Sequence, residues 1–200
     1  KRSITSVFLP TTACANTVFL TGYPPQQHSL TGWDINLKET GTVATILRFK
    51  PMFGGNIFTD SNIMVRAILD IPGFYEGLKT DSYIIIDEKI ANSPFNKYIC
   101  GPAKVLPIKG YKQAFTKMQG ILKRRSKKRR FVHAYLPELD SLAHTHGIKS
   151  KEVRNIFYDL DKRIKRFVGS MKNKNSLVII TADHGFIDSP KDTQLWVENF

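Results

Sequence analysis

The chain has 200 residues, a length that suits one α/β domain or two small ones. Hydrophobic residues make up 42% of the sequence, which excludes a disordered chain because there is enough apolar material for a core. The formal net charge of +13 attracts phosphate esters, nucleic acids and acidic membranes alike, so it does not choose among these partners. No apolar run reaches the roughly 20 residues of a membrane helix, so no transmembrane segment is predicted.

Strand-like and helix-like segments alternate along the first half of the chain. Residues 4–8 are a β-branched and aromatic run typical of a strand, and residues 13–20 predict a small-residue helix that ends at Gly22 and Pro24. Three further elements follow: a strand over 43–49, a helix over 62–69 capped by Ser61, and a buried strand over 82–86. Residues 88–110 are rich in Pro, Gly and Asn, and they predict an irregular connection.

The second half continues the alternation. A helix is predicted from residue 111 to 122, a strand over 131–135, an amphipathic helix over 153–168 and a last strand over 177–181. Strands that alternate with crossover helices indicate a mostly parallel sheet covered on both faces, the α/β class. Because no repeat or low-complexity linker interrupts the sequence, residues 1–200 are predicted to form a single domain.

Reactive side chains follow three of the predicted strands. Thr12 follows the first strand and opens a helix, Asp140 and His144 follow the strand over 131–135, and Asp183 and His184 follow the last strand. In open parallel sheets, sites form beyond the carboxyl ends of the strands. The sequence therefore predicts that these side chains converge at one edge of the sheet.

Asp140 and His144 have the spacing of a metal-binding pair. Oxygen and nitrogen donors four residues apart can meet one ion if the segment is a helical turn, and this combination suits zinc. The alternative is a surface carboxylate and a capping imidazole.

Asp183 and His184 end a strand of Leu, Val and Ile. Two ionisable groups at the end of a buried strand are costly unless they pair with other groups or bind metal. An ordinary strand end that meets a polar loop is the alternative.

Thr12 stands at a helix start, where a hydroxyl is most often a helix cap. The same position places the hydroxyl in the positive field of the helix N-terminus, and a nearby metal would lower its pKa further. Thr12 is therefore also a candidate nucleophile for an attack on phosphorus.

These motifs carry a resemblance to a known family. Residues 9–12 (LPTT) and 20–30 (LTGYPPQQHSL) resemble the nucleophile segment of type I phosphodiesterases and nucleotide pyrophosphatases, in the alkaline phosphatase superfamily. Residues 135–144 (YLPELDSLAH) resemble their second metal segment, and residues 181–185 (TADHG) match the third. The resemblance runs from about residue 3 to residue 186 in the family's order.

The resemblance implies a three-layer αβα sandwich and a two-zinc site. Asp140 and His144 would bind one zinc ion, and Asp183, His184 and Thr12 the other. The implied function is zinc-dependent hydrolysis of phosphodiester or nucleotide pyrophosphate bonds through a phospho-threonine intermediate, with a phosphate ester or nucleotide as substrate.

The substrate-binding segment departs from the family pattern. Trp33 stands where many eukaryotic nucleotide pyrophosphatases place an Asn that binds a phosphoryl oxygen, and the sequence resembles the bacterial branch instead. Asn36 or the Ala13 backbone N–H is expected to substitute for this Asn. Trp33 either stacks on a base or fills the core, and His28 matches a structural histidine of the family.

Two family ligands are missing from the sequence. The family supplies an Asp before the nucleophile and a His well after the Asp–His pair, but no Asp or Glu precedes Thr12 and no His follows His184. We therefore expect a catalytic domain truncated at both ends that binds zinc weakly and is inactive by itself. Local replacement by Asp188 or His146 is the alternative.

The strongest charge cluster runs from Lys123 to Arg130, between a predicted helix and strand. We call residues 123–130 the basic loop. Its cations either suit the helix C-terminus or contact a polyanion or acidic lipid. Two alternative functions stay open on the sequence: a phosphomonoesterase or phosphonate hydrolase of the same superfamily, and a degenerate, non-catalytic member that binds polyanions.

Overall fold

A computed structural model describes residues 3–172 and 174–189. The chain separates into two compact units. The first contains Lys1–Leu136 and Ile179–His184, and the second contains Pro137–Val178 and Gly185–Phe200. Among the described residues, no helix is long and apolar enough to cross a lipid bilayer.

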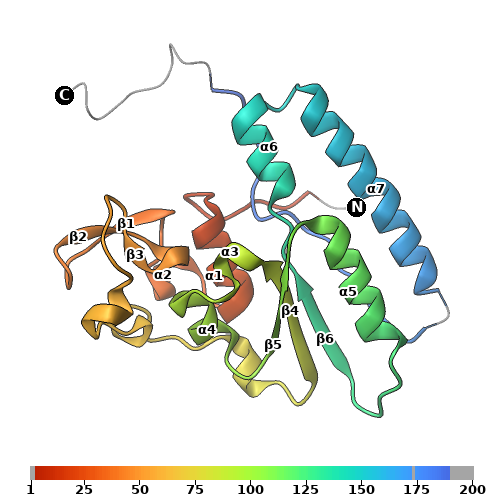
Figure 1. The fold of residues 1–200 in the computed structure, drawn as a ribbon, viewed down its shortest axis with the longest axis horizontal. Helices are drawn as coiled ribbons and strands as arrows, with labels where there is room; N and C mark the ends of the chain where they lie inside the picture. The colour runs from red at the N-terminus through yellow and green to blue at the C-terminus, as the bar shows by residue number, and fades with distance from the viewer. Residues whose placement is uncertain (1–2, 173, 190–200) are drawn as a thin grey trace. The chain divides into compact units, whose positions relative to one another are not determined.

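A three-stranded parallel sheet is the centre of the first unit (Figure 1). Its strands are β4 (Asp81–Asp87), β5 (Lys104–Ile108) and β6 (Arg130–Ala134), in the order β5-β4-β6. β4 pairs with both neighbours in parallel, from Tyr83 opposite Lys104 and from Asp81 opposite Arg130. The predicted parallel sheet is therefore confirmed, with β4 as its central strand.

Both faces of this sheet are covered by helices. Successive side chains of β4 point to opposite sides, so neighbouring residues of this strand belong to different cores. Ile84 and Ile86 belong to the larger core cluster, with residues of α1 (Thr12–Thr21) and α4 (Pro94–Cys100). Ile85 belongs to a separate cluster with Ala114 and Ile121 of α5 (Tyr111–Lys123). Helices thus lie on each side of the sheet, as the predicted three-layer αβα arrangement requires (Figure 1).

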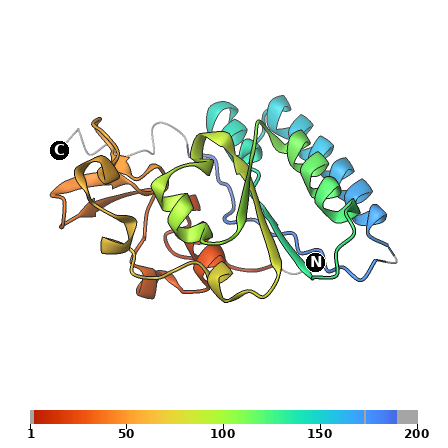
Figure 2. The same ribbon diagram turned by 60° about the horizontal axis from the view of Figure 1, so that its bottom comes forward.

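A small antiparallel sheet lies at the end of this unit away from α5 (Figures 1 and 2). It consists of β1 (Asp34–Leu37), β2 (Thr42–Thr45) and β3 (Lys50–Pro51), and it follows the short helix α2 (Pro25–His28). The strand predicted over residues 43–49 is too long. It ends at Thr45 because a 3₁₀ turn, Ile46–Arg48, follows and Phe49 takes a left-handed conformation with φ of 56°.

The helix predicted over residues 62–69 is wrong. The structure has two 3₁₀ turns in this region, Phe58–Ser61 and Val65–Ala67, and a third at Phe74–Gly77. Asn62 ends the first of these turns with φ of 60°, and this left-handed residue prevents one continuous helix.

The irregular connection predicted over residues 88–110 is also wrong. This region forms α3 (Glu88–Ala91), α4 and β5. The residues that suggested loops begin the helices instead: the Asp87 side chain caps α3, the Ser93 side chain caps α4, and Pro94 occupies the first helical position.

The first and last predicted strands do not form as strands in the structure. Residues 4–8 and 177–181 have no strand assignment, and the side chains of Ile4, Leu177 and Ile179 are 74%, 84% and 78% exposed. Their composition suits a strand, but a strand also needs a neighbour that shares its ladder of hydrogen bonds.

The second unit contains α6 (Glu138–His146) and α7 (Lys151–Ser170), which lie against each other. The Ser150 hydroxyl caps α7 by accepting a hydrogen bond from Val153 N. The amphipathic helix predicted over 153–168 is confirmed, and Ile156 and Phe167 are its buried side chains.

Candidate active site

Thr12 is held at the first position of α1 by a helix built from small side chains. Thr11 is the helix cap, and its hydroxyl accepts a hydrogen bond from Cys14 N at 3.4 Å. Ala13 and Cys14 are fully buried, so the start of α1 fits into the core. The helix ends at Gly22, which takes φ of 79° and donates its N–H to Val18 O. Thr11 therefore does the capping, which leaves the Thr12 hydroxyl available for chemistry.

His184 lies beside Thr12, although 172 positions separate them in the sequence. His184 Nε2 is 3.1 Å from Thr12 Oγ1, within hydrogen-bonding distance, and Thr12 is only 6% exposed. Asp183 Oδ2 lies 3.7 Å from the same His184 Nε2. A hydroxyl, an imidazole and a carboxylate thus gather at the start of α1.

A contact that sequence reasoning missed holds this arrangement. The Ser6 hydroxyl donates a hydrogen bond to the backbone carbonyl of Asp183, and so joins the segment before α1 to the segment that carries Asp183 and His184. No signal in the sequence identifies Ser6, because a serine that bonds a distant backbone carbonyl has no local pattern.

Asp140 and His144 lie in the second unit, on consecutive turns of α6. Asp140 Oδ1 is 3.4 Å from His144 Nε2, so the predicted i, i+4 pair forms. The His144 side chain is 78% exposed and the Asp140 side chain 25%. This pair and the Thr12–His184 pair belong to different units, and each has its geometry within its own unit.

The two alternative ligands named from the sequence also lie in the second unit. Asp188 Oδ1 accepts a hydrogen bond from Ile148 N at 3.2 Å, so this carboxylate stabilises the turn after α6. His146 is the last residue of α6 and is exposed.

The predicted substrate-binding residues lie in and before the small antiparallel sheet. Asn36 is an exposed residue of β1, opposite Val43 of β2. Trp33 precedes β1 and is 42% exposed, so it is not part of the buried core. The role of both residues in substrate binding stays a prediction.

His28 has the structural environment predicted for it. It is 2% exposed, and its Nδ1 accepts a hydrogen bond from Leu30 N at 3.0 Å. Burial lowers the pKa of His28, because the charged imidazole would lose its hydration. The neutral ring therefore stabilises the turn after α2.

A second, half-buried histidine was not predicted to matter. His133 of β6 places its Nδ1 3.0 Å from the hydroxyl of Tyr75, which is 1% exposed. Burial lowers the pKa of His133 and raises the pKa of Tyr75. His133, Asn16 and Asn96 line a cavity of about 30 Å³. Since ligand pockets measure roughly 300 Å³ or more, this cavity has room for water and not for a nucleotide.

The family assignment follows from a comparison with known proteins. The model of the type I phosphodiesterase / nucleotide pyrophosphatase family matches residues 1–200. The chain belongs to this family.

Two solved structures support the same fold. Murine ectonucleotide pyrophosphatase / phosphodiesterase 5 (NPP5) aligns with a TM-score of 0.57 and 13% identity, over 84% of this chain and 43% of the murine chain. An inactive variant of murine NPP5 in complex with AMP gives a TM-score of 0.57 and 12% identity, with the same coverage. The chain thus spans less than half the length of murine NPP5. No curated protein matches the sequence.

The donor atoms of this family member suit zinc in their chemistry and spacing. Nitrogen and oxygen ligands at about 2.0–2.1 Å from a tetrahedral zinc ion lie about 3.3 Å from one another. The separations of 3.1 and 3.7 Å around His184 Nε2, and of 3.4 Å between Asp140 and His144, agree with this spacing. Within residues 3–172 and 174–189, no three carboxylate, imidazole or thiol groups gather closely enough to hold a metal ion. The Thr12 hydroxyl lies beside His184 as a further oxygen donor.

Proposed function

We propose that the chain carries part of the catalytic site of a zinc-dependent hydrolase that cleaves phosphodiester or nucleotide pyrophosphate bonds, with Thr12 as its nucleophile. Family membership supports the reaction class. The observation that carries the assignment of the nucleophile is the 3.1 Å separation between Thr12 Oγ1 and His184 Nε2. It joins two of the three family motifs at one buried point.

Thr12 has the position that a nucleophile needs. Its hydroxyl lies at the N-terminus of α1, where the helix supplies a positive partial charge and first-turn N–H groups that suit a phosphoryl oxygen. His184 contacts the Thr12 side chain from the distant segment, and Asp183 in turn contacts His184. These contacts orient Oγ1 before substrate binds, so less entropy is lost on the way to the transition state.

The proposed reaction has two displacements at phosphorus. In the first, Thr12 Oγ1 releases its proton to solvent and forms a bond to phosphorus. The bond from phosphorus to the leaving-group oxygen breaks, and this oxygen takes up a proton from solvent. In the second, water attacks the phospho-threonine and its oxygen binds phosphorus. The bond from phosphorus to Thr12 Oγ1 breaks, and the proton that the attacking water releases replaces the one that Oγ1 takes up. Protonation of Oγ1 restores the hydroxyl and the product is a phosphate monoester.

Two zinc ions are proposed as cofactors. Thr12, Asp183 and His184 would hold one, and Asp140 and His144 would contribute to the other. When bound, zinc favours ionisation of the threonine hydroxyl and neutralises charge on the phosphoryl oxygens.

A nucleotide is the proposed substrate class. The complex of murine NPP5 with AMP supports this choice, since it shows that a protein of this fold can hold a nucleoside monophosphate. Asn36 and Trp33 are the proposed substrate-binding residues of this chain, through a phosphoryl oxygen and the base respectively.

A parallel assay tests the proposal on the protein that carries this chain. Bis-p-nitrophenyl phosphate and p-nitrophenyl phosphate are compared, each with added zinc and with chelator. Faster, chelator-sensitive release of nitrophenol from the diester supports the proposal. A preference for the monoester would favour the phosphomonoesterase alternative, and zinc binding without turnover of either ester would favour a non-catalytic member.

A further inference from the structure

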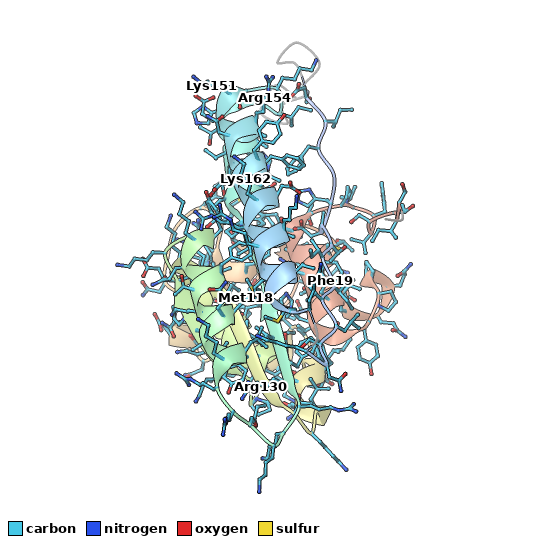
Figure 3. All side chains as sticks on the ribbon, turned by 90° about the vertical axis from the view of Figure 1, so that its right-hand side faces the viewer. Phe19, Met118, Arg130, Lys151, Arg154 and Lys162 are labelled. Carbon is cyan, nitrogen blue, oxygen red and sulfur yellow. The ribbon has the colours of Figure 1, made fainter. Side chains whose placement is uncertain are left out.

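The basic loop joins α5 to β6 and is exposed along residues 123–129. It carries seven cations in eight positions: Lys123, Arg124, Arg125, Lys127, Lys128, Arg129 and Arg130. Among the described residues, none of these cations forms an ion pair with a carboxylate. Nitrogen-tipped side chains spread from the loop beside Arg130 (Figure 3).

The C-terminal end of α5 is stabilised by the Arg130 side chain. Arg130 donates from Nη1 to Ile121 O at 2.8 Å and from Nη2 to Arg124 O, so its guanidinium satisfies carbonyls at the helix C-terminus. Ser126 shapes the turn, because its Oγ accepts a hydrogen bond from Lys128 N at 3.0 Å. Lys123 lies in the last turn of α5, where a cation is also favourable. The helix end therefore does not explain the other five cations, Arg124, Arg125, Lys127, Lys128 and Arg129.

The cationic surface continues beyond the loop. Parallel strands begin at one edge of a sheet, so the residues at the starts of β4, β5 and β6 lie on the same side as the basic loop. Lys79, just before β4, and Lys104, the first residue of β5, are both exposed there. Asp81 lies opposite Arg130 in the register, and the exposed Glu76 lies beside Gly101 ahead of β5, so two carboxylates accompany the cations of this edge.

We propose that the basic loop, with Lys79 and Lys104, is a binding site for nucleic acid, which it holds through the phosphates. Arginine forks and lysine ammonium groups both bind phosphate oxygens well. A membrane is the less suitable partner, because membrane-binding cations usually flank a hydrophobic helix or lie beside apolar side chains that insert into the lipid. Ser126 is the one residue of the loop that is not a cation. This site does not depend on the proposed catalytic function.

Binding of a fluorescein-labelled 20-nucleotide oligothymidylate, measured by anisotropy from 50 to 300 mM NaCl, tests the site. EDTA is included so that metal-dependent hydrolysis does not consume the probe. The loop variant changes Arg125, Lys127, Lys128 and Arg129 to Gln and keeps the structural Arg130. The matched control changes Lys151, Arg154, Lys162 and Lys165 of α7, all exposed, to Gln, which removes the same charge. Figure 3 labels the first three of these residues.

We expect the loop variant to bind the probe at least about tenfold more weakly at 50 mM NaCl, and the slope of log affinity against log salt to fall by about 3, as for four lost contacts to a single strand. The control should change affinity by less than about twofold. Equal losses in both variants would show that net charge alone acts, and would overturn the proposal. It is also overturned if vesicles of phosphatidylserine and phosphatidylcholine lose affinity for the loop variant while the oligonucleotide does not. If the fourfold variant unfolds, Lys127→Gln with Lys128→Gln provides the same comparison.

Discussion

Thr12 Oγ1 and His184 Nε2 lie 3.1 Å apart, although one residue opens the first helix and the other comes 172 positions later. The Ser6 hydroxyl, bonded to the carbonyl of Asp183, stabilises the same junction from the segment before the helix. The proposed catalytic chemistry therefore depends on a contact between two distant segments of the sequence. This dependence can be tested one residue at a time.

Loss of a proposed ligand should remove metal and activity together. Asp140→Asn and His184→Ala are each expected to weaken zinc binding by more than the roughly 10- to 100-fold that loss of an outer-shell partner costs. Hydrolysis of the diester should fall in parallel. Zinc affinity is measured by titration at buffered free zinc, and hydrolysis by turnover of the diester. Asp70→Asn, an exposed surface carboxylate, is the control. Lost activity with unchanged zinc stoichiometry would show that the altered residue is not a ligand.

Neutralisation of the basic loop should leave the chemistry of small substrates intact. The loop lies at the amino-terminal edge of the parallel sheet, whereas sites in such sheets form beyond the carboxyl ends of the strands. The variant with Gln at positions 125, 127, 128 and 129 is expected to keep kcat/KM for bis-p-nitrophenyl phosphate within about twofold. A large fall in kcat/KM would refute the placement of this loop away from the reacting atoms.

Gly73→Ala should destabilise the first unit. A Cβ at Gly73 would lie 1.7 Å from the carbonyl oxygen of Ile99 and 2.8 Å from its carbonyl carbon, so the backbone of α4 would have to move. We expect a loss of about 3 kcal/mol in the free energy of unfolding, the upper end of the usual cost of overpacking. Gly77→Ala is the matched control, because nothing lies within 4 Å of its added Cβ. Urea unfolding of both variants measures the difference, and equal stabilities would contradict this packing.

The half-buried His133 beside Tyr75 should make the free energy of unfolding depend on pH. Burial lowers the pKa of His133, so the unfolded chain binds more protons than the folded chain as the pH falls below about 6.5. The stabilisation by neutral His133 is therefore present above that pH and is lost as the pH falls. The pKa of His28 is also lowered, so His28 changes the stability in the same direction.

Unfolding free energies at pH 7.5, 6.5 and 5.5 test this prediction. The decrease in unfolding free energy between pH 7.5 and pH 5.5 should be smaller in His133→Gln than in the unaltered chain. His146→Gln, which alters an exposed histidine, should keep the original dependence. An identical loss for all three proteins would rule out a role for His133.

The elements that could be predicted from the sequence are those with a strong internal pattern. β4 has three consecutive isoleucines that fill both faces of the sheet, and α7 has apolar residues at helical spacing. β5 escaped prediction because Pro107 interrupts it. A proline is tolerated there because β5 is an edge strand.

Motifs single out residues of the candidate site, whereas the contacts between distant segments are seen only in the structure. The motif at residues 181–185 identified His184, and the structure places it at Thr12. Ser6 carries no motif, and the segments around it that have strand composition form no strand. Strand propensity describes one segment at a time, whereas the hydrogen bonds of a sheet require two paired segments.

The most direct test of the central claim compares two neighbouring hydroxyls. In the protein that carries this chain, kcat/KM for bis-p-nitrophenyl phosphate with zinc is measured for Thr12→Ala and Thr11→Ala. Thr11→Ala removes the helix cap and should cost about 1 kcal/mol of stability with most of the activity kept. Thr12→Ala should remove turnover while the fold remains. Turnover that survives in Thr12→Ala, or that is lost equally in both variants, would contradict the assignment of Thr12 as the nucleophile.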